Sequence, residues 1–294
     1  MIDSKEGNRM KIFADSACDL PKEFFDENEV ILFPLHVQLN EKNYQDILEI
    51  SPKELYDAMR KGATPKTSQV SPEEFLKELE KLAKSGEEGL YIAFSSNLSG
   101  TYNTGVMIAN QLREEYPQFH LNIIDSKCAS LGYGFLVKKA VEYRNAGLSL
   151  SEITEKIENL AKHMTHIFTV ENLDYLAAGG RISKSSAFIG GLLSIKPILH
   201  MEDGKLIPLE KIRGRKKAIN RIIEMMAQRG GDFSNKIVGI SHSDDLAFAQ
   251  EVQALIEKKL HPKGFDITNI GAVIGAHVGP GTIAIFFTDR EYEE

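Results

Sequence analysis

Hydroxyl side chains gather in two polar segments of this chain. Ser95 and Ser96 come directly after an apolar run, and Thr101 follows them just before a stretch with apolar residues at helical spacing. Hydroxyls in a strand-to-helix turn commonly cap the helix. The same turn can also bind an anion, because the first amide groups of a helix lack intrahelical partners and the helix dipole favours negative charge there. A polar loop containing Thr67 and Ser68 would add donors if it lies at the same edge of the sheet.

Two further side chains, in the second half of the chain, could contact an anion. Arg181 follows the flexible turn Gly179-Gly180, and a guanidinium can donate two hydrogen bonds at once to a carboxylate. His277 lies in the segment GAHVGPG, whose glycines and proline impose an unusual backbone path. A neutral imidazole donates one hydrogen bond, and a protonated one adds charge. Because these donors lack a strong base beside them, they suit binding an anion more than converting it.

The motifs of several common enzyme classes are absent from the sequence. There is no GxxxxGK[ST] phosphate loop, no GxSxG nucleophile elbow and no group of His, Cys and Asp residues with metal-ligand spacing. The first apolar run leads into Asp15-Ser16-Ala17-Cys18 instead of GxGxxG, which argues against a dinucleotide enzyme. We therefore expect neither a metal nor a cofactor. A hydrolytic triad of Ser96, His277 and a carboxylate stays open, although no motif supports it.

Composition limits the class of protein. The chain has 294 residues, more than one hydrophobic core usually serves, so we expect two domains. Apolar residues make up 42% and charged residues 26%, as in soluble globular proteins, and the net charge of -7 argues against nucleic acid as a partner. The two cysteines, Cys18 and Cys128, lie far apart, and residues 1–9 lack the apolar run of a signal peptide. We predict a cytoplasmic protein without stable membrane insertion.

The first part of the chain alternates apolar runs with helical patterns. The apolar runs that predict strands cover residues 10–14, 30–37, 90–94 and 121–124. Ser51 and Ser71 each begin a capping box with Pro at the first helical position. This alternation is typical of a mostly parallel sheet with helices on both faces. In such sheets, binding sites form at the carboxyl ends of strands, where Ser95 and Ser96 are expected.

The pattern changes near residue 164. Six apolar runs that predict strands follow, at residues 166–170, 197–201, 205–209, 236–240, 266–270 and 282–287. Asp203-Gly204, between the second and third runs, is a strong hairpin signal. We predict an α/β protein with a flexible leader at 1–9, an N-terminal domain with a mostly parallel sheet at 10–164, and a C-terminal α+β domain with a mixed or antiparallel six-stranded sheet at 165–294.

The stretch from Glu171 to Met201 combines a cation with an apolar segment. Its first half ends in Gly179-Gly180-Arg181, and the segment from Ala187 to Leu199 is almost wholly apolar. A helix that is apolar all round must be buried, and this one is too short to span a bilayer. It is either an ordinary core helix beside a glycine turn or one wall of an apolar cavity with Arg181 at its mouth.

A run of basic residues stands out in this acidic chain. It comprises Lys205, Lys211, Arg213, Arg215, Lys216, Lys217 and Arg221. Such runs usually form a solvated helix face. The alternative is a docking patch for an acidic partner protein, with Arg213, Arg215 and Lys216 as its candidate residues.

In this order, the motifs resemble the DegV family of bacterial fatty-acid-binding proteins, over nearly the whole chain from Lys11 to Phe287. The segments that carry the resemblance are Asp15 to Pro21, Lys66 to Gln69, Ser95 to Tyr102, Asp125-Ser126, Leu173 to Ile182, and His277 to Gly281. At Ala17 many relatives have a third hydroxyl residue instead, so one possible donor is missing here.

The resemblance implies a long-chain fatty acid, such as palmitate, stearate or oleate, buried between two α/β domains. The residues implied at its carboxylate are Thr67 and Ser96, their neighbours Ser68 and Ser95, and Arg181 and His277. The candidates for contact with its acyl tail are Phe188, Ile189, Leu192 and Leu193. The resemblance also implies a carrier without catalysis, which presents the carboxylate to the ATP-binding subunit of a fatty acid kinase. A Ser/His acyl hydrolase and a regulatory interaction module are the alternatives.

Overall fold

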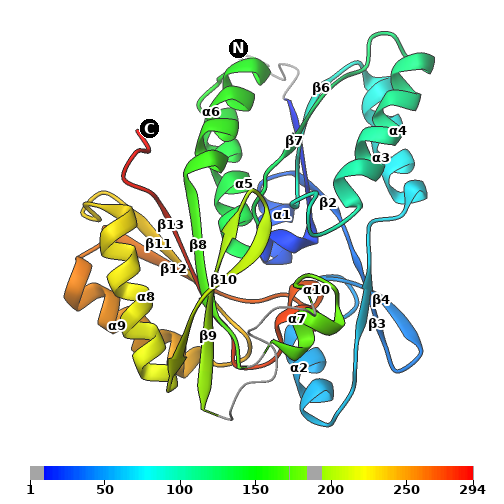
Figure 1. Ribbon diagram of the computed structural model, residues 1–294. Coiled ribbons are helices and arrows are strands. Elements are labelled where there is room, and N and C mark those ends of the chain that lie inside the picture. Colours follow the sequence, from blue (N-terminus) through cyan, green and yellow to red (C-terminus); the bar gives the residue numbers. More distant parts are fainter. Residues whose placement is uncertain (1–9, 172, 184–193, 294) are drawn as a thin grey trace.

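The computed structural model describes residues 10–171, 173–183 and 194–293, and it confirms an α/β fold with two larger sheets (Figure 1). The first sheet is four-stranded and wholly parallel, in the order β2-β1-β6-β7. Its strands are β1 (Lys11–Asp15), β2 (Val30–Phe33), β6 (Glu88–Ala93) and β7 (His120–Asp125). Nearly every residue of β1 and β6 is buried, because helices cover both faces of the sheet.

The helices of this half lie on opposite sides of the four-stranded sheet. Figure 1 shows α3 (Pro72–Ser85) and α4 (Thr101–Glu115) on one side, and α5 (Ser130–Asn145) and α6 (Leu150–His163) on the other. The short segments η1 (Ser16–Cys18) and α1 (Lys22–Glu27) follow β1. The capping boxes expected at Ser51 and Ser71 are both present, and they begin α2 (Pro52–Arg60) and α3.

The second sheet has six strands in the order β10-β9-β8-β13-β11-β12, and all neighbours are antiparallel except β11 and β12. Its strands are β8 (Met164–Thr169), β9 (Ile195–Glu202), β10 (Lys205–Arg213), β11 (Ile237–His242), β12 (Gly264–Asn269) and β13 (Ile283–Thr288). On one face lie α8 (Arg215–Gly230) and α9 (Leu246–Leu260) (Figure 1). All six strands therefore start at or after the position where the sequence pattern changes.

Helix α5 lies between the two larger sheets. It contacts β1 of the first sheet and β8, β11 and β13 of the second. Its buried residues include neighbours in sequence, such as Leu131, Gly132 and Tyr133, so the helix has no solvated face along its first turns. A helix that is buried on all sides belongs between layers. The face of the six-stranded sheet opposite α8 and α9 is thus covered by the first half of the chain.

A third, smaller sheet was not expected. It has the antiparallel order β4-β3-β5, with β3 (His36–Leu39), β4 (Lys42–Gln45) and β5 (Lys66–Ser68). Two short helices, α7 (Asp174–Ala178) and α10 (Ala272–Val278), pack on each other, and α10 also contacts β3, β5 and α2. Thr67 and Ser68, which were expected in a loop, therefore lie in a strand.

Two other expectations need correction. The single strand expected at 30–37 is divided between two sheets, because Pro34 has no amide hydrogen for a sheet ladder and separates β2 from β3. The apolar helix expected from Ala187 to Leu199 is wrong where the structure describes the chain, since residues 195–202 form β9. A short apolar run is compatible with a buried helix and with a buried strand. The tail-wall candidates Phe188, Ile189, Leu192 and Leu193 lie outside the described residues.

The hairpin expected at Asp203-Gly204 is confirmed. Both residues have positive φ, 45° and 74°, which a two-residue turn between β9 and β10 requires. Within the ranges that the structure describes, no helix combines the length and the apolar character that crossing a membrane requires.

Candidate functional site

A polar pocket lies where the small sheet, the turn before α4 and helix α10 meet. The residues that line it are Leu35, Thr67, Ser68, Gln69, Phe94, Leu98, Ser99, Gly100, Arg181, Val273, Ile274 and His277. Four of the six residues expected at an anion are in this set: Thr67, Ser68, Arg181 and His277. They come from β5, from the turn after α7 and from the end of α10, so three distant segments build the pocket.

Thr67 and His277 contact each other inside this pocket. The distance between Thr67 Oγ1 and His277 Nε2 is 2.7 Å. Burial, and secondly the charge of Arg181, lower the pKa of His277 to about 4, so its imidazole is neutral at pH 7. Among the described residues, Nδ1 of His277 has no hydrogen-bond partner. We therefore assign the proton to Nε2, which donates to Thr67 and leaves the threonine hydroxyl free to donate to a ligand.

Arg181 supplies the positive charge of the pocket. Its Nε donates to the carbonyl oxygen of Leu98 at 3.0 Å, and its Nη1 donates to that of Gly179 at 2.6 Å. A guanidinium carries five N–H donors, so the described residues leave three of them without an acceptor. The side chain is half-buried, burial lowers its pKa, and no carboxylate among the described residues pairs with it. A half-buried cation without a protein counterion favours an anionic ligand.

The glycine turn brings Arg181 to His277. A Cβ at position 179 would collide with Nδ1 of His277, so only glycine allows the turn to approach the imidazole this closely. Gly180 has a φ of 74°, in the left-handed region that glycine adopts without strain. Close approach to His277 therefore requires glycine at position 179, and the positive φ favours glycine at position 180. The sequence alone did not reveal these requirements.

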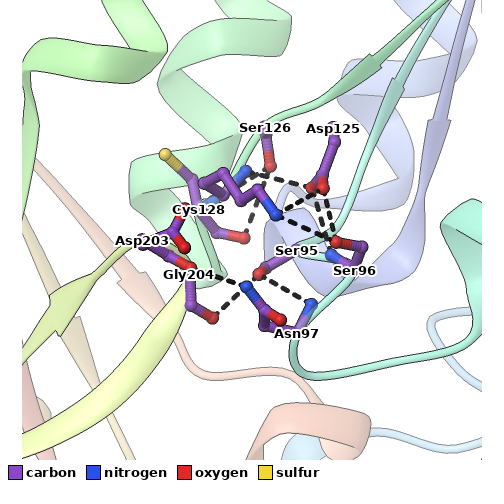
Figure 2. Close-up of polar contacts among 9 residues, drawn as sticks. Ser95, Ser96, Asn97, Asp125, Ser126, Cys128, Asp203 and Gly204 are labelled. Carbon is purple, nitrogen blue, oxygen red and sulfur yellow. Dashed lines mark hydrogen bonds and ion pairs between the residues drawn. The ribbon is translucent and has the colours of Figure 1, made fainter.

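Ser95 and Ser96 do not line this pocket. Ser95 Oγ donates to the carbonyl oxygen of Gly204 at 2.8 Å, and Asn97 Nδ2 donates to that of Asp203 at 2.6 Å, so the tip of the β9–β10 hairpin rests on this turn (Figure 2). Ser96 Oγ donates to Asp125, the last residue of the neighbouring strand β7. Both hydroxyls are thus engaged in contacts within the protein.

The amides at the start of this turn are satisfied within the protein, whereas Ser99 and Gly100, directly before α4, line the polar pocket. Ser96 N donates to Asp125 Oδ1 at 3.0 Å, Asn97 N to Ser95 Oγ at 3.3 Å, and Leu98 N to the Ser95 carbonyl at 3.0 Å. Asp125 already places a negative charge beside the turn, and a second anion there would be repelled. The sequence did not indicate that these donors would be satisfied from within.

The hydrolytic triad is not assembled either. Ser96 contacts Asp125 and Lys127, with 3.1 Å from Lys127 Nζ to Ser96 Oγ, whereas His277 contacts Thr67. The hydrogen bond to Asp125 raises the pKa of Lys127, so its amine is protonated and cannot act as a base. Among the described residues, Ser96 therefore has no histidine partner, which the proposed triad requires.

A narrow apolar cavity continues from the polar pocket, and Leu98, Ile274 and His277 line both. The remaining residues around the cavity are Ala129, Ser130, His166, Phe168, Leu176, Met201, Leu206, Ile270, Val278, Thr282, Ala284 and Phe286. Half of these residues lie on strands β8, β9, β10 and β13 of the six-stranded sheet, on the face toward the first half of the chain. A cationic mouth that leads into an apolar cavity suits an amphipathic anion with one long apolar tail.

Two buried aspartate side chains position α10, and with it His277. Asp19 Oδ1 accepts from Gly271 N at 2.9 Å, and Asp46 Oδ1 accepts from Ala272 N at 3.2 Å. Burial raises the pKa of Asp19 to about 8 and that of Asp46 to about 6. Asp19 belongs to the first motif of the chain, so this motif holds the binding helix in place across the two halves.

Arg215, a candidate for partner docking, makes several contacts within the protein. Its Nη1 pairs with Asp245 at 2.7 Å, its Nη2 donates to the carbonyl oxygen of Gly281 at 2.9 Å, and its guanidinium lies 3.6 Å from the ring centre of Phe248. The side chain therefore holds the loop after His277. Arg213 and Lys216 remain exposed at the surface.

Known proteins match this chain over nearly its full length. A family model described as "Uncharacterised protein, DegV family" matches residues 9–290. A DegV domain-containing protein of Clostridium perfringens is 39% identical over 279 residues, which cover 94% of this chain and 96% of that protein.

Two solved structures resemble the whole molecule. One is described as showing fatty acid binding of a DegV family protein from Thermus thermophilus, with a TM-score of 0.85 and 30% identity, covering 96% of this chain and 99% of the other. The second is a stearic acid-binding protein from Eubacterium ventriosum, with a TM-score of 0.87 and 29% identity, covering 96% and 98%. Agreement of this extent in sequence and in fold shows that the chain belongs to the DegV family.

Proposed function

We propose that this protein binds a long-chain fatty acid such as palmitate, stearate or oleate, with the carboxylate in the polar pocket and the tail in the apolar cavity. The observation that carries this proposal is Arg181, a half-buried cation without a described carboxylate partner, at the entrance of a cavity with apolar walls. Fatty acid binding by the two structural relatives supports it.

The carboxylate contacts four side chains in this proposal. Arg181 provides charge and donors, Thr67 and Ser68 provide hydroxyls, and His277 orients the Thr67 hydroxyl through the hydrogen bond at Nε2. Charge-assisted hydrogen bonds of this kind offset the cost of removing a carboxylate from water. Ser95 and Ser96 have no part in this head-group site, because their hydroxyls are engaged elsewhere.

The acyl tail supplies most of the affinity. Each methylene group that leaves water contributes about 0.8 kcal/mol, so a sixteen-carbon tail contributes roughly 10 kcal/mol before the costs of ordering. The head-group donors then determine the position of the chain along the cavity.

We further propose that the protein is a carrier, which presents the bound carboxylate to the ATP-binding subunit of a fatty acid kinase and performs no catalysis of its own. The groups around the carboxylate are donors, and the one candidate base among the four, His277, has its pKa lowered to about 4. Such groups hold an anion but do not activate a nucleophile at neutral pH. Both cysteines, Cys18 and Cys128, are buried and free, as in a reducing compartment, and we propose the cytoplasm as the location.

Solvent extraction of the purified protein tests the binding proposal. Mass spectrometry of the extract should show a stoichiometric long-chain acid, and delipidated protein should take up palmitate or oleate. A protein that retains no acid and takes up none contradicts the proposal. For the carrier role, the loaded protein with ATP should form acyl phosphate only when a kinase ATP-binding subunit is added. Formation without that subunit would show that the protein has catalysis of its own.

A further inference from the structure

The apolar cavity follows two neighbouring strands away from the head-group pocket. Its lining residues include Thr282, directly before β13, and Ala284 and Phe286 on β13. Thr282 lies next to the segment that contains His277, since its Oγ1 donates to the Val278 carbonyl at 3.0 Å. Each step of two residues leads farther from the pocket. Four residues of extended strand span about 13 Å, so β13 alone provides a path of that length for an acyl tail.

Strand β8 leads the same way from the other side. It runs antiparallel to β13, with Phe168 opposite Ala284 and His166 opposite Phe286. The chain that follows β8 leads through α7 to Arg181, so Phe168 is nearer to the head-group pocket and His166 is farther from it. The His166–Phe286 pair is therefore the most remote pair of cavity residues on these two strands.

Close packing shuts the cavity at this pair. The rings of His166 and Phe286 meet edge to face, with centroids 5.2 Å apart and planes at 86°. Helix α5 covers both rings at Gly132, where an added Cβ would collide with the imidazole and with the phenyl ring. A tail that reaches this point meets two rings and a helix backbone.

A separate groove begins directly behind the two rings. The next residues on the same face of the sheet are Met164 and Thr288, which are again paired. They line a groove with Phe135 and Leu160, whereas the tail cavity ends with His166 and Phe286. The ring pair thus separates two cavities that would otherwise be continuous along the sheet.

His166 is held so that it acts as a rigid apolar wall. Its Nε2 accepts from Ala129 N at 3.3 Å, and its Nδ1 donates to the Met164 carbonyl at 3.2 Å. With both nitrogens engaged, and with burial lowering its pKa to about 4, the ring stays neutral and shows carbon atoms to the cavity. Hydrogen bonds on both sides fix the ring between α5 and β8.

We infer that His166, packed between Phe286 and Gly132, is the stop for the acyl tail and determines the longest fatty acid that this protein binds well. This inference rests on the proposed function, and it adds the residue that selects chain length. An acid whose methyl end just reaches the ring gains all its contacts, and a longer acid must bend or withdraw its carboxylate from Arg181.

Substitutions that move the stop provide the first test, with relative affinities measured by competition among lauric, myristic, palmitic, stearic and arachidic acids. His166→Ala makes room for roughly two methylene groups, and each contributes about fourfold in affinity. The affinity for the acid two carbons beyond the wild-type optimum, relative to that optimum, should therefore rise about fifteenfold. His166→Phe fills more space and should shift the optimum to a shorter acid.

His163→Ala is the matched control, because this histidine lies three residues earlier and contacts Asp289 outside the cavity. It should leave the order of affinities unchanged. If the wild type binds these acids and His166→Ala and His166→Phe keep the wild-type order, the stop is wrong while the proposed function stands. A wild type that binds none of them contradicts both.

Cross-linking of the wild type decides the matter without any substitution. A fatty acid with a diazirine at its methyl end is bound, irradiated and mapped by peptide mass spectrometry. Labels should appear at His166, Phe286 or residues 129–132. Labels confined to Met201 and Leu206, on the β9–β10 hairpin, would mean that the tail leaves the cavity at the hairpin and would overturn the inference.

Discussion

Two hydroxyl-rich segments of this protein have similar compositions and opposite uses. The turn with Ser95, Ser96 and Asn97 donates its hydrogen bonds to Asp125 and to the tip of the β9–β10 hairpin (Figure 2). Strand β5 instead places Thr67 in a pocket, where His277 orients its hydroxyl. The first segment joins the two halves of the molecule, and the second leaves donors available for a ligand.

The difference shows that a count of donors does not identify a binding site. What matters is whether acceptor groups of the protein itself already form hydrogen bonds with these donors. Asp125 is the last residue of β7, which pairs in parallel with β6. This pairing places its carboxylate beside the Ser96 turn. Arg181 donates to the neutral carbonyl oxygens of Leu98 and Gly179 but pairs with no carboxylate among the described residues, so an anion has to come from outside.

Removal of the charge in the pocket should have the largest effect. Arg181→Ala eliminates charge-assisted hydrogen bonds that contribute about 2 kcal/mol, so fatty acid affinity should fall about thirtyfold. Titration calorimetry or displacement of a fluorescent acid measures this change. Arg221→Ala is the matched control, because Arg221 pairs with Glu210 and lies outside the pocket. Equal fatty acid affinities for the two variants would show that the pocket with Arg181 and Thr67 does not bind the carboxylate.

Disruption of the hairpin contact should mainly affect stability. In Gly204→Ala the new Cβ collides with Ser95 Oγ, and φ at this position is 74°, so the free energy of unfolding should fall by about 2 kcal/mol. Gly86→Ala is the control for φ alone, since Gly86 has a φ of 72° and no atom within 4 Å of an added Cβ. That variant should lose only about 1 kcal/mol in urea denaturation. Equal losses would mean that the hairpin tip contributes nothing.

Two hydroxyl deletions compare the segments directly. Ser95→Ala should lower the free energy of unfolding by about 1 kcal/mol and leave fatty acid affinity unchanged, because its hydroxyl contacts Gly204. Thr67→Val keeps the shape of the side chain and should weaken binding about fivefold, because the carboxylate loses one donor. Parallel denaturation and binding experiments on both variants provide the test. A loss of affinity in Ser95→Ala would indicate that Ser95 belongs to the head-group site.

The smallest expected effect is a pH dependence of stability. Burial raises the pKa of Asp19 to about 8, above its unfolded value, so the folded state keeps a proton that the unfolded state loses. The stability that Asp19 contributes is complete at low pH and is lost as the pH rises through about 8. Between pH values of about 7 and 8, the free energy of unfolding should decrease by about 1 kcal/mol.

Asp19→Asn isolates this contribution, because an amide does not titrate. The variant should show a smaller decrease over the same pH range in thermal denaturation. Burial also lowers the pKa of His166 and His277 to about 4, which affects stability only at lower pH and in the opposite direction. A variant with the same pH slope as the wild type would show that Asp19 is ionised throughout.

The main strands could be read from the sequence, because buried strands appear as short apolar runs and each is a local feature. The small sheet could not, since β4 (KNYQ) and β5 (KTS) are short and polar and become strands only by pairing with β3. Residues 195–202 could be interpreted as a strand or as part of a helix, because a short apolar run fits either structure. Strands that depend on a distant partner carry little local signal.

The candidate site shows the same division. Thr67, Ser68, Arg181 and His277 were candidates from their chemistry and from the family resemblance, and the structure brings them to one pocket. The partners that occupy Ser95 and Ser96 lie 109 and 29 residues away in sequence. No local pattern reports contacts of that kind.

The sequence by itself determined the family, the main strands, the helix caps, the Asp203-Gly204 hairpin and the set of possible donors. These features depend on side-chain chemistry and backbone preferences within a few residues. Only the tertiary structure decided which donors face a ligand and where the apolar cavity stops at His166. The reason is physical: free donors and cavity ends are defined by which surfaces pack together, and packing joins residues from β5, β8, α5 and α10 that are far apart along the chain.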